Sequence, residues 1–147
     1  MSKRTFWLVA PLVLVGCSPG PKSAKGFQLP DGNVEAGQAA FVELGCMSCH
    51  TVDGFDFSYG DGERSIDVRL GGEVHRVRTY GELVTAIIHP SEGFARGYPK
   101  AQVSSAGKSL MKDFNRTMTV GQLIDIVAFL QSKYTEYLPE HYDPTIP

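Results

Sequence analysis

Apolar residues recur every three or four positions in three segments of the chain, which is the spacing of one face of an α-helix. The first segment spans residues 34–45, follows the polar turn Asp31-Gly32-Asn33 and ends at Gly45. Its apolar and small residues at this spacing are Val34, Gly37, Phe41 and Leu44. A glycine inside a helix costs about 1 kcal/mol relative to alanine, so Gly37 indicates that another helix crosses closely at this point.

Two further helices are marked at their start by a capping box, in which a threonine and the residue three positions later bond each other's backbone N–H. Thr79 and Glu82 open the segment 79–89, and its apolar face consists of Leu83, Val84, Ile87 and Ile88. Thr119 and Gln122 open the last segment. Its continuous apolar stripe, typical of a helix packed on a core, consists of Val120, Leu123, Ile124, Val127, Leu130 and Tyr134.

Between residues 66 and 78 the pattern changes to strict alternation. Residues 66–70 and 74–78 alternate apolar with polar on either side of Gly71-Gly72, which predicts a small β-hairpin. Residues 51–67 contain the aromatic residues Phe55, Phe57 and Tyr59. They are interpreted either as a loop that wraps the edge of a cofactor or as an ordinary surface loop. Residues 91–110, with three glycines and a proline, are expected to be irregular.

The first residues predict export and a lipid anchor. Lys3 and Arg4 precede an apolar run that is too short to span a bilayer and fits a signal peptide. The run closes with Leu14-Val15-Gly16-Cys17. This resembles the bacterial lipobox, in which the cysteine is lipidated and becomes the new first residue; an ordinary cleaved signal and an uncleaved anchor are the alternatives. The expected parts are a signal peptide at 1–16, a lipidated tether at 17–30, one domain at 31–136 and an extended tail at 137–147.

Charge and composition narrow the range of functions. The chain has 14 Lys and Arg against 16 Asp and Glu. Loss of Lys3 and Arg4 with the signal would leave 12 against 16, a net charge of about −4, so nucleic-acid binding is disfavoured. The single tryptophan, Trp7, would leave as well. A small core without tryptophan is thin, and a buried cofactor would supply the missing apolar volume.

The candidate chemistry lies in Cys46-Met47-Ser48-Cys49-His50, which has the C-x-x-C-H pattern of covalent haem c attachment. Each thiol adds to one haem vinyl group, and the histidine becomes the proximal iron ligand. A structural zinc site would need four Cys or His ligands, but the third cysteine, Cys17, lies in the targeting segment. A redox dithiol would need a strand-to-helix turn in a βαβ unit, and no such alternation surrounds Cys46.

A second iron ligand would distinguish a closed electron carrier from an open haem that binds gases or peroxide. Met111 lies in the irregular segment before the last helix, and we expect it to be the distal ligand. Met118 directly precedes the Thr119 cap and is suited to a hydrophobic staple with Leu123. The remaining alternatives are solvent and the histidines His75, His89 and His141. A thioether ligand would raise the reduction potential.

The chain resembles a class I c-type cytochrome over about residues 33–134. The resemblance rests on Gly37 and Phe41 before the motif at 45–54, and on Met111-Lys112-Asp113-Phe114 and residues 118–130 near the end. It implies a mainly α fold in which the first and last helices cross around one haem, with the hairpin as an insertion. Gly37, Phe41 and Phe129 would lie at the crossing. Residues 83–90 and 97–99 look most like the cytochrome domains fused to subunit II of some haem-copper oxidases.

Two features depart from the family pattern. A proline usually follows the motif closely, and its carbonyl orients the haem histidine, but residues 51–61 contain none. That contact must therefore come from elsewhere in the chain or be missing. A proline also commonly follows the ligand methionine, whereas here the residue is Lys112.

The function expected from these observations is single-electron transfer by one covalent haem, without substrate chemistry on the protein. The protein would be anchored by its lipid, face the bacterial periplasm and exchange electrons with a redox protein or a respiratory membrane complex, with no nucleic-acid or small-molecule partner. Water would be excluded by Phe41, Leu83, Ile87, Leu123 and Val127. Candidate propionate contacts are Tyr80, Tyr98 and Arg64. The alternatives are a five-coordinate haem sensor or peroxide-reducing enzyme, and a lipoprotein that binds no haem.

Overall fold

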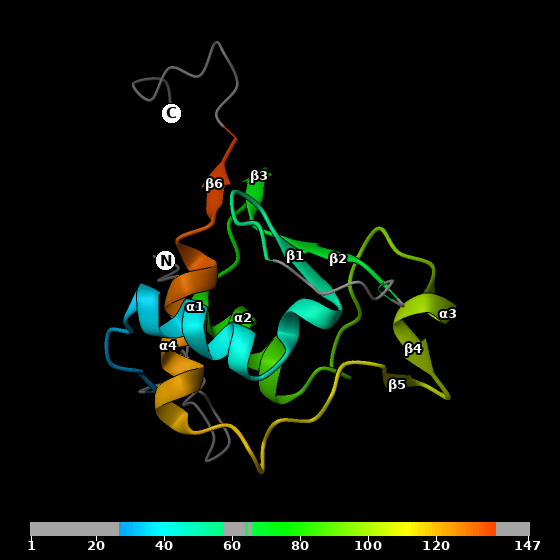
Figure 1. The fold of residues 1–147 in the computed structure, drawn as a ribbon. Helices are drawn as coiled ribbons and strands as arrows, with labels where there is room; N and C mark the ends of the chain where they lie inside the picture. The colour runs from blue at the N-terminus through cyan, green and yellow to red at the C-terminus, as the bar shows by residue number, and fades with distance from the viewer. Residues whose placement is uncertain (1–26, 58–63, 65, 138–147) are drawn as a thin grey trace, which may run out of the picture.

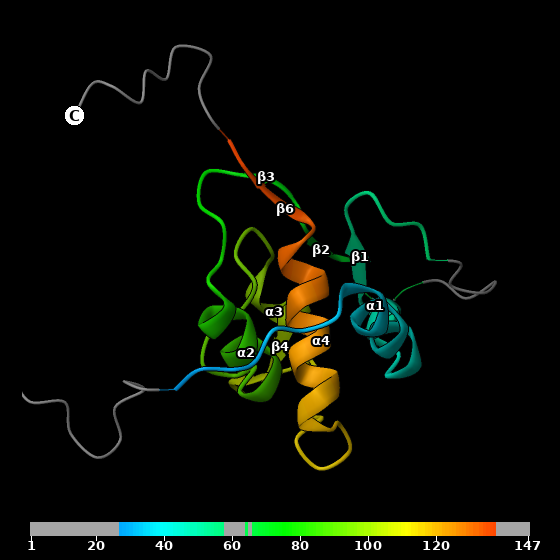
Figure 2. The ribbon, with the colours of Figure 1, turned by 90° about the vertical axis from the view of Figure 1, so that its left-hand side faces the viewer.

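The computed structural model describes residues 27–57, 64 and 66–137, and its centre is the packing of the first helix against the last. Helix α1 spans Val34–Glu43 and helix α4 spans Val120–Gln131, and the two cross as Figure 1 shows. Helix α2, Tyr80–Ile88, also packs on α4, which therefore lies between α1 and α2 (Figure 2). The expected signal peptide, the lipidation site Cys17 and nearly all of the tail lie outside the described residues.

The crossing of α1 and α4 depends on the absence of a side chain at Gly37. A Cβ atom at this position would lie 1.9 Å from the carbonyl oxygen of Asp125 in α4. The close approach predicted from Gly37 is therefore confirmed. Next to it, Phe41 and Phe129 are 2% and 0% exposed, and their rings meet edge to face with centroids 5.8 Å apart. Such aromatic pairs add about 0.5–1.5 kcal/mol beyond the area they bury.

Both predicted capping boxes are confirmed. Thr79 Oγ1 accepts from the Glu82 N–H at 3.2 Å, and the Glu82 carboxylate accepts from the Thr79 N–H at 2.8 Å. Thr119 and Gln122 make the same pair of bonds at 3.1 and 2.9 Å. The first helix is capped by Asn33, whose side chain accepts from the Ala36 N–H at 2.7 Å. A cap of this kind stabilises a helix by about 1 kcal/mol. Helices α1, α2 and α4 each start directly after the capping residue that the sequence indicates.

The prediction of a hairpin around Gly71-Gly72 is wrong. Strand β2, Val68–Leu70, pairs in parallel with β1, His50–Val52. Strand β3, Gly72–Val74, pairs in parallel with β6, Tyr134–Glu136, which follows α4. Both pairs can be followed in Figure 1. The two flanking strands thus find different partners far away in the sequence.

The reason lies in the turn between β2 and β3. Gly71 and Gly72 have φ of +80° and +82°, which redirects the chain. A Cβ at Gly71 would lie 2.9 Å from the carbonyl oxygen of Lys133, and the Gly72 N–H donates to that same oxygen at 2.8 Å. The glycines therefore accommodate the end of α4 rather than a hairpin turn. Tyr134, predicted as the last residue of the helical stripe, consequently begins β6.

The segment expected to be irregular contains a short helix and a true hairpin. Helix α3 spans Lys100–Val103, and β4, Ser104–Ser105, pairs antiparallel with β5, Lys108–Ser109. The connecting residues Ala106 and Gly107 have φ of +48° and +77°. Two successive positive φ values are typical of a type I′ turn. Alanine is unusual at the first of these positions, which is why the sequence pattern gave no hairpin signal here.

The core lies where α1, α2 and α4 meet the segment after α1. All five residues expected to exclude water, Phe41, Leu83, Ile87, Leu123 and Val127, are buried. Ile88, the fourth apolar residue predicted for α2, is 38% exposed and lies at the edge of the core. Val52 and Phe57 extend the same cluster from the segment that carries the C-x-x-C-H motif. The motif is therefore placed against the centre of the fold.

Candidate functional site

The C-x-x-C-H motif forms a tight turn directly after α1. Gly45, with φ of +72°, ends the helix, and the 3-10 helix η1, Cys46–Ser48, follows it. The Cys49 N–H donates to the Cys46 carbonyl at 3.2 Å, which closes the turn. Cys46 is the first residue of this 3-10 helix and Cys49 caps its end, so the two cysteines are one short turn apart. Both are half-buried free thiols.

The environment of Cys46 favours the neutral thiol. Burial above all, and to a smaller extent the nearby Cys49, raise its pKa to about 11 against the opposing effect of a backbone hydrogen bond. Reactive dithiols and zinc-binding cysteines depend on the thiolate, which a lowered pKa favours. This environment therefore disfavours the redox-dithiol interpretation of the motif.

His50 is held by one ring nitrogen. Its Nδ1 lies 3.1 Å from the backbone carbonyl oxygen of Val68. A carbonyl only accepts, so Nδ1 carries the hydrogen and Nε2 keeps its lone pair. Burial lowers the pKa of His50, although the bond to Val68 and the charge of Asp67 oppose this shift. The result is a neutral imidazole whose Nε2 is available as an iron ligand.

The Val68 carbonyl takes the place of the proline carbonyl that the family resemblance leads one to expect. Second-shell acceptors of this kind fix the orientation of a ligand histidine and raise its basicity. In this chain the acceptor comes from a strand, because β1 and β2 pair with His50 opposite Val68. The Val68 N–H also donates to the Cys49 carbonyl at 2.8 Å. Strand β2 therefore bonds both Cys49 and His50 of the motif.

Side chains across the strand pair hold the same register. Thr51 Oγ1 donates to Asp67 Oδ1 at 2.8 Å. The Arg69 guanidinium forms an ion pair with the Asp53 carboxylate. A one-residue slip would separate both pairs and move His50 away from the Val68 carbonyl. The orientation of the imidazole thus depends on short parallel pairing that local sequence pattern does not reveal.

Aromatic side chains surround the inner face of the motif. The Phe41 ring lies 6.4 Å from the His50 ring and 5.3 Å from the Phe57 ring, between centroids. Phe55 packs against Phe57 at 4.2 Å and against Phe129 at 5.9 Å. From the sequence, residues 51–67 are interpreted either as a loop around a cofactor or as an ordinary surface loop. The second interpretation is wrong for Phe55 and Phe57, because Phe57 is buried in the core cluster and Phe55 packs against it. Tyr59 lies outside the described residues.

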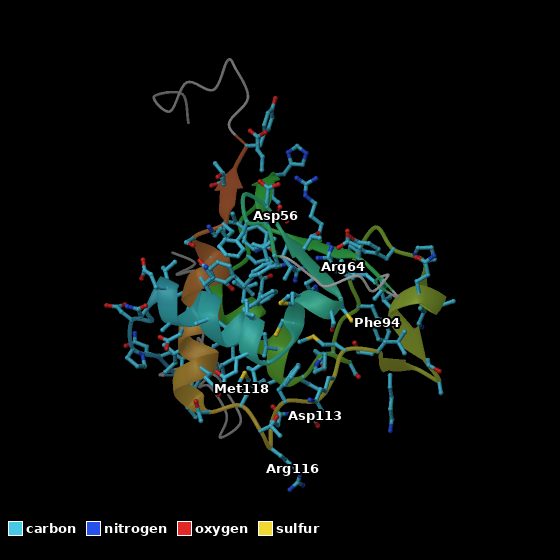
Figure 3. All side chains as sticks on the ribbon, in the orientation of Figure 1. Asp56, Arg64, Phe94, Asp113, Arg116 and Met118 are labelled. Carbon is cyan, nitrogen blue, oxygen red and sulfur yellow. The ribbon has the colours of Figure 1, made fainter. Side chains whose placement is uncertain are left out.

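The two candidate methionine ligands share the same core cluster. Met111 and Met118 are both half-buried and packed against it, as are Cys46 and Met47 of the motif. Figure 3 shows Met118 beside the start of α4, as expected for the residue that precedes its cap. The Met111 N–H donates to Ser109 Oγ at 3.1 Å, which fixes its backbone to the end of β5. The structure therefore packs both methionines and the C-x-x-C-H turn against one apolar cluster.

The alternative histidine ligands lie elsewhere. His75 and His89 are exposed: the His75 ring packs on Tyr137 with centroids 5.6 Å apart, and His89 Nδ1 lies 3.5 Å from a Glu92 oxygen. His141 lies outside the described residues. Neither exposed histidine belongs to the core cluster that contains Met111 and Met118.

The three residues considered for propionate contacts already bond the protein backbone. The Tyr80 hydroxyl donates to the Phe27 carbonyl at 3.0 Å, and the Tyr98 hydroxyl accepts from the Arg69 N–H at 2.9 Å. Arg64 Nε donates to the Met47 carbonyl at 3.1 Å, beside the attachment turn (Figure 3). Arg64 is the one of the three that contacts the motif, and nothing in its sequence context indicates this backbone contact.

Within residues 27–57, 64 and 66–137, no three His, Cys, Asp or Glu side chains are grouped so as to hold a metal ion. Among the same residues, no helix has the length and apolarity needed to cross a membrane. Comparisons of the chain with protein-family models, curated proteins and solved structures find no match.

Proposed function

We propose that this chain is a membrane-tethered monohaem c-type cytochrome that transfers single electrons between redox partners on the periplasmic side of a bacterial membrane. The observation that carries the proposal is the attachment turn. Two free thiols lie at the start and at the cap of a short 3-10 helix, and the following histidine offers Nε2 because Nδ1 is bonded to the Val68 carbonyl. This donor set matches what covalent haem c requires.

Each part of the site has a distinct role in this proposal. Cys46 and Cys49 form the thioether bonds, and His50 is the proximal ligand. Haem iron, when bound, supplies the one-electron exchange between its ferric and ferrous forms. Phe41, Phe57 and the aliphatic residues of α2 and α4 keep water away, and an apolar environment disfavours the more highly charged ferric state. The protein itself carries out no bond-making step after attachment.

We further propose Met111 as the distal ligand. Its side chain is half-buried against the core cluster and lies in a loop, whereas His75 and His89 are exposed. Met118 shares the cluster, but it directly precedes the Thr119 cap of α4, where the sequence predicts a hydrophobic staple with Leu123 of the same cluster. We therefore assign Met118 a structural role at the start of α4. A thioether at the distal position would raise the reduction potential and suit an electron carrier better than a gas sensor.

The proposed tether places the domain next to its partners. Lipidation at Cys17 would confine the protein to a membrane surface and raise its effective concentration near a membrane-bound donor or acceptor. Redox encounters of this kind use small and weak interfaces. We therefore propose a respiratory complex, or a redox protein beside one, as the partner. The same arrangement suits a permanent subunit as well as a mobile shuttle.

The test uses the full chain exported in a host that matures c-type cytochromes. Intact-mass measurement after acid denaturation should show one haem, together with the lipid on Cys17, added to the chain lacking residues 1–16. Visible spectra of the oxidised wild type should contain a weak far-red iron–sulfur band. Met111→Ala should abolish this band and lower the reduction potential, while the matched Met118→Ala should keep it.

Three results would contradict parts of the proposal. A properly exported chain without added haem mass would refute the cytochrome function as a whole. An unchanged spectrum in Met111→Ala would reject Met111 as the ligand. Binding of carbon monoxide to the reduced wild type without delay or denaturant would favour an open haem, and hence a sensor or a peroxide-reducing enzyme.

A further inference from the structure

The peptide group between Val68 and Arg69 is hydrogen-bonded on both sides. Its carbonyl oxygen accepts from His50 Nδ1 at 3.1 Å, and its N–H donates to the Tyr98 hydroxyl oxygen at 2.9 Å. We propose that Tyr98 is a positioning residue for His50 and acts on it through this peptide. The inference rests on the proposed role of His50 as an iron ligand, but names a residue that the attachment motif does not contain.

Tyr98 is placed for this contact by the residues on either side of it. Gly97 has φ of +86°, which turns the chain before Tyr98, and Pro99 is the N-terminal cap of α3. The Gln102 N–H donates to the Pro99 carbonyl at 2.8 Å, which holds this end of the loop. Figure 1 shows α3 on the side of the molecule on which β2 lies. The half-buried tyrosine is therefore presented to β2 from a separate segment.

The hydrogen bond to Tyr98 comes from the backbone of Arg69 and not from its side chain. The Arg69 guanidinium is paired with Asp53 across the β1–β2 pair and also interacts electrostatically with Tyr98, whereas the hydrogen bond to the Tyr98 hydroxyl is donated by the backbone N–H. The backbone carbonyl of Val68 and the N–H of Arg69 belong to one planar peptide. The hydroxyl and the imidazole therefore bond opposite ends of a single polarisable group.

The consequence for His50 follows from hydrogen-bond cooperativity. A peptide whose N–H donates is a stronger acceptor at its carbonyl, by about 10–30% per bond in a chain. A stronger acceptor at Nδ1 makes the imidazole a more basic ligand. A more basic ligand stabilises ferric over ferrous iron and lowers the reduction potential. Tyr98 would thus oppose the upward effect of a distal thioether.

The test compares Tyr98→Phe with Tyr137→Phe in the exported full-length holoprotein. Tyr137 is the matched control, because it is exposed, packs on the His75 ring and is not one of the candidate propionate contacts. Haem content by intact mass, reduction potential and the NMR shift of the His50 Nδ1 proton are measured. Tyr98→Phe should raise the potential and move the Nδ1 proton upfield, with one haem still attached. Tyr137→Phe should leave both values unchanged.

An unchanged potential and an unchanged Nδ1 proton in haem-loaded Tyr98→Phe would overturn the role of Tyr98 and leave the cytochrome function intact. Wild type without covalent haem would refute the cytochrome function and this role together. If Tyr98→Phe does not accumulate, amide hydrogen exchange of Arg69 in the wild type decides the question. A slowly exchanging Arg69 amide supports the bond to Tyr98, and a rapidly exchanging one overturns it.

Discussion

The helix pair α1–α4 and the strand pair β1–β2 both contact the C-x-x-C-H turn at residues 46–50, but they stabilise it in different ways. The helices meet through buried groups, with Gly37 against the α4 backbone and Phe41 against Phe129. The strands are three residues long, and the side-chain pairs across them are exposed. Buried packing supplies most of the stability of a domain, whereas exposed polar pairs add little. The helices therefore determine whether the domain folds, and the strands determine how His50 is oriented.

The largest expected effect comes from filling the helix crossing. Gly37→Ala would place a Cβ atom 1.9 Å from the Asp125 carbonyl oxygen, so the two helix backbones must separate. Overpacking of a core costs about 1–3 kcal/mol, and contact with backbone puts this change at the upper end, about 3 kcal/mol. Urea denaturation of the purified protein measures the loss.

The matched control for that change is Gly121→Ala in α4. A Cβ there would meet nothing closer than Thr119 Oγ1 at 3.9 Å. An alanine in place of a helical glycine should be neutral or stabilise by up to about 1 kcal/mol. Equal stability of Gly37→Ala and wild type would show that the crossing is not the basis of the fold.

A smaller effect is expected from the strand pair. Thr51→Val keeps the shape and β-branching of the side chain but removes its hydrogen bond to Asp67. An exposed hydrogen bond of this kind contributes about 0.5–1 kcal/mol at most, so global stability should change little. Looser pairing should nevertheless speed solvent exchange of the His50 Nδ1 proton, as measured by NMR. Thr135→Val, the same change on an exposed position of β6, should leave that exchange rate as it is. Equal exchange rates in both variants would contradict the idea that the β1–β2 pair orients His50.

The smallest effect concerns acid stability at the start of α2. The Arg76 guanidinium, together with the Thr79 N–H, lowers the pKa of Glu82 from an ordinary 4.5 to about 2. A depressed pKa in the folded state means that the stabilisation is present above pH 4.5 and is lost as the pH falls through 2. Glu82→Gln should therefore flatten the decrease in stability across this range. Midpoints of urea unfolding measured between pH 7 and pH 2 test this. Arg76→Gln should flatten the decrease in stability over the same pH range. A decrease as steep as that of the wild type in either variant would contradict the pairing of Glu82 with Arg76.

The helical part of the fold could be predicted because its signals are local. Apolar spacing and the Thr79 and Thr119 capping boxes depend on residues within one or two turns of each other. Even the contact at Gly37 could be inferred, because an interior glycine is costly without a close neighbour. The C-x-x-C-H motif is equally local, and the structure places its two cysteines at the start and at the cap of a single short turn.

The strand pairs could not be predicted in the same way. The alternation around Gly71-Gly72 gives the position of β2 and β3 but not their partners, which lie at residues 50–52 and 134–136. His50 is hydrogen-bonded to the backbone carbonyl of Val68, and the hydroxyl that bonds the N–H of the same peptide comes from Tyr98, 29 residues after Arg69. Backbone partners leave no signature in side-chain pattern. The orientation of the candidate iron ligand was therefore the part of the site least accessible from sequence.

The parallel pairing of β3 with β6 also suggests an order in which the parts of the domain come together during folding. Gly72 and Tyr134 close a much longer loop than His50 and Val68, and closure entropy grows with loop length. Because β6 follows α4 after a short turn, docking of α4 on α1 delivers β6 to β3 and removes most of that entropic cost. Non-local strand pairing is slow to form unless other contacts first bring the strands together. We therefore expect β6 to pair with β3 only after α4 has met α1.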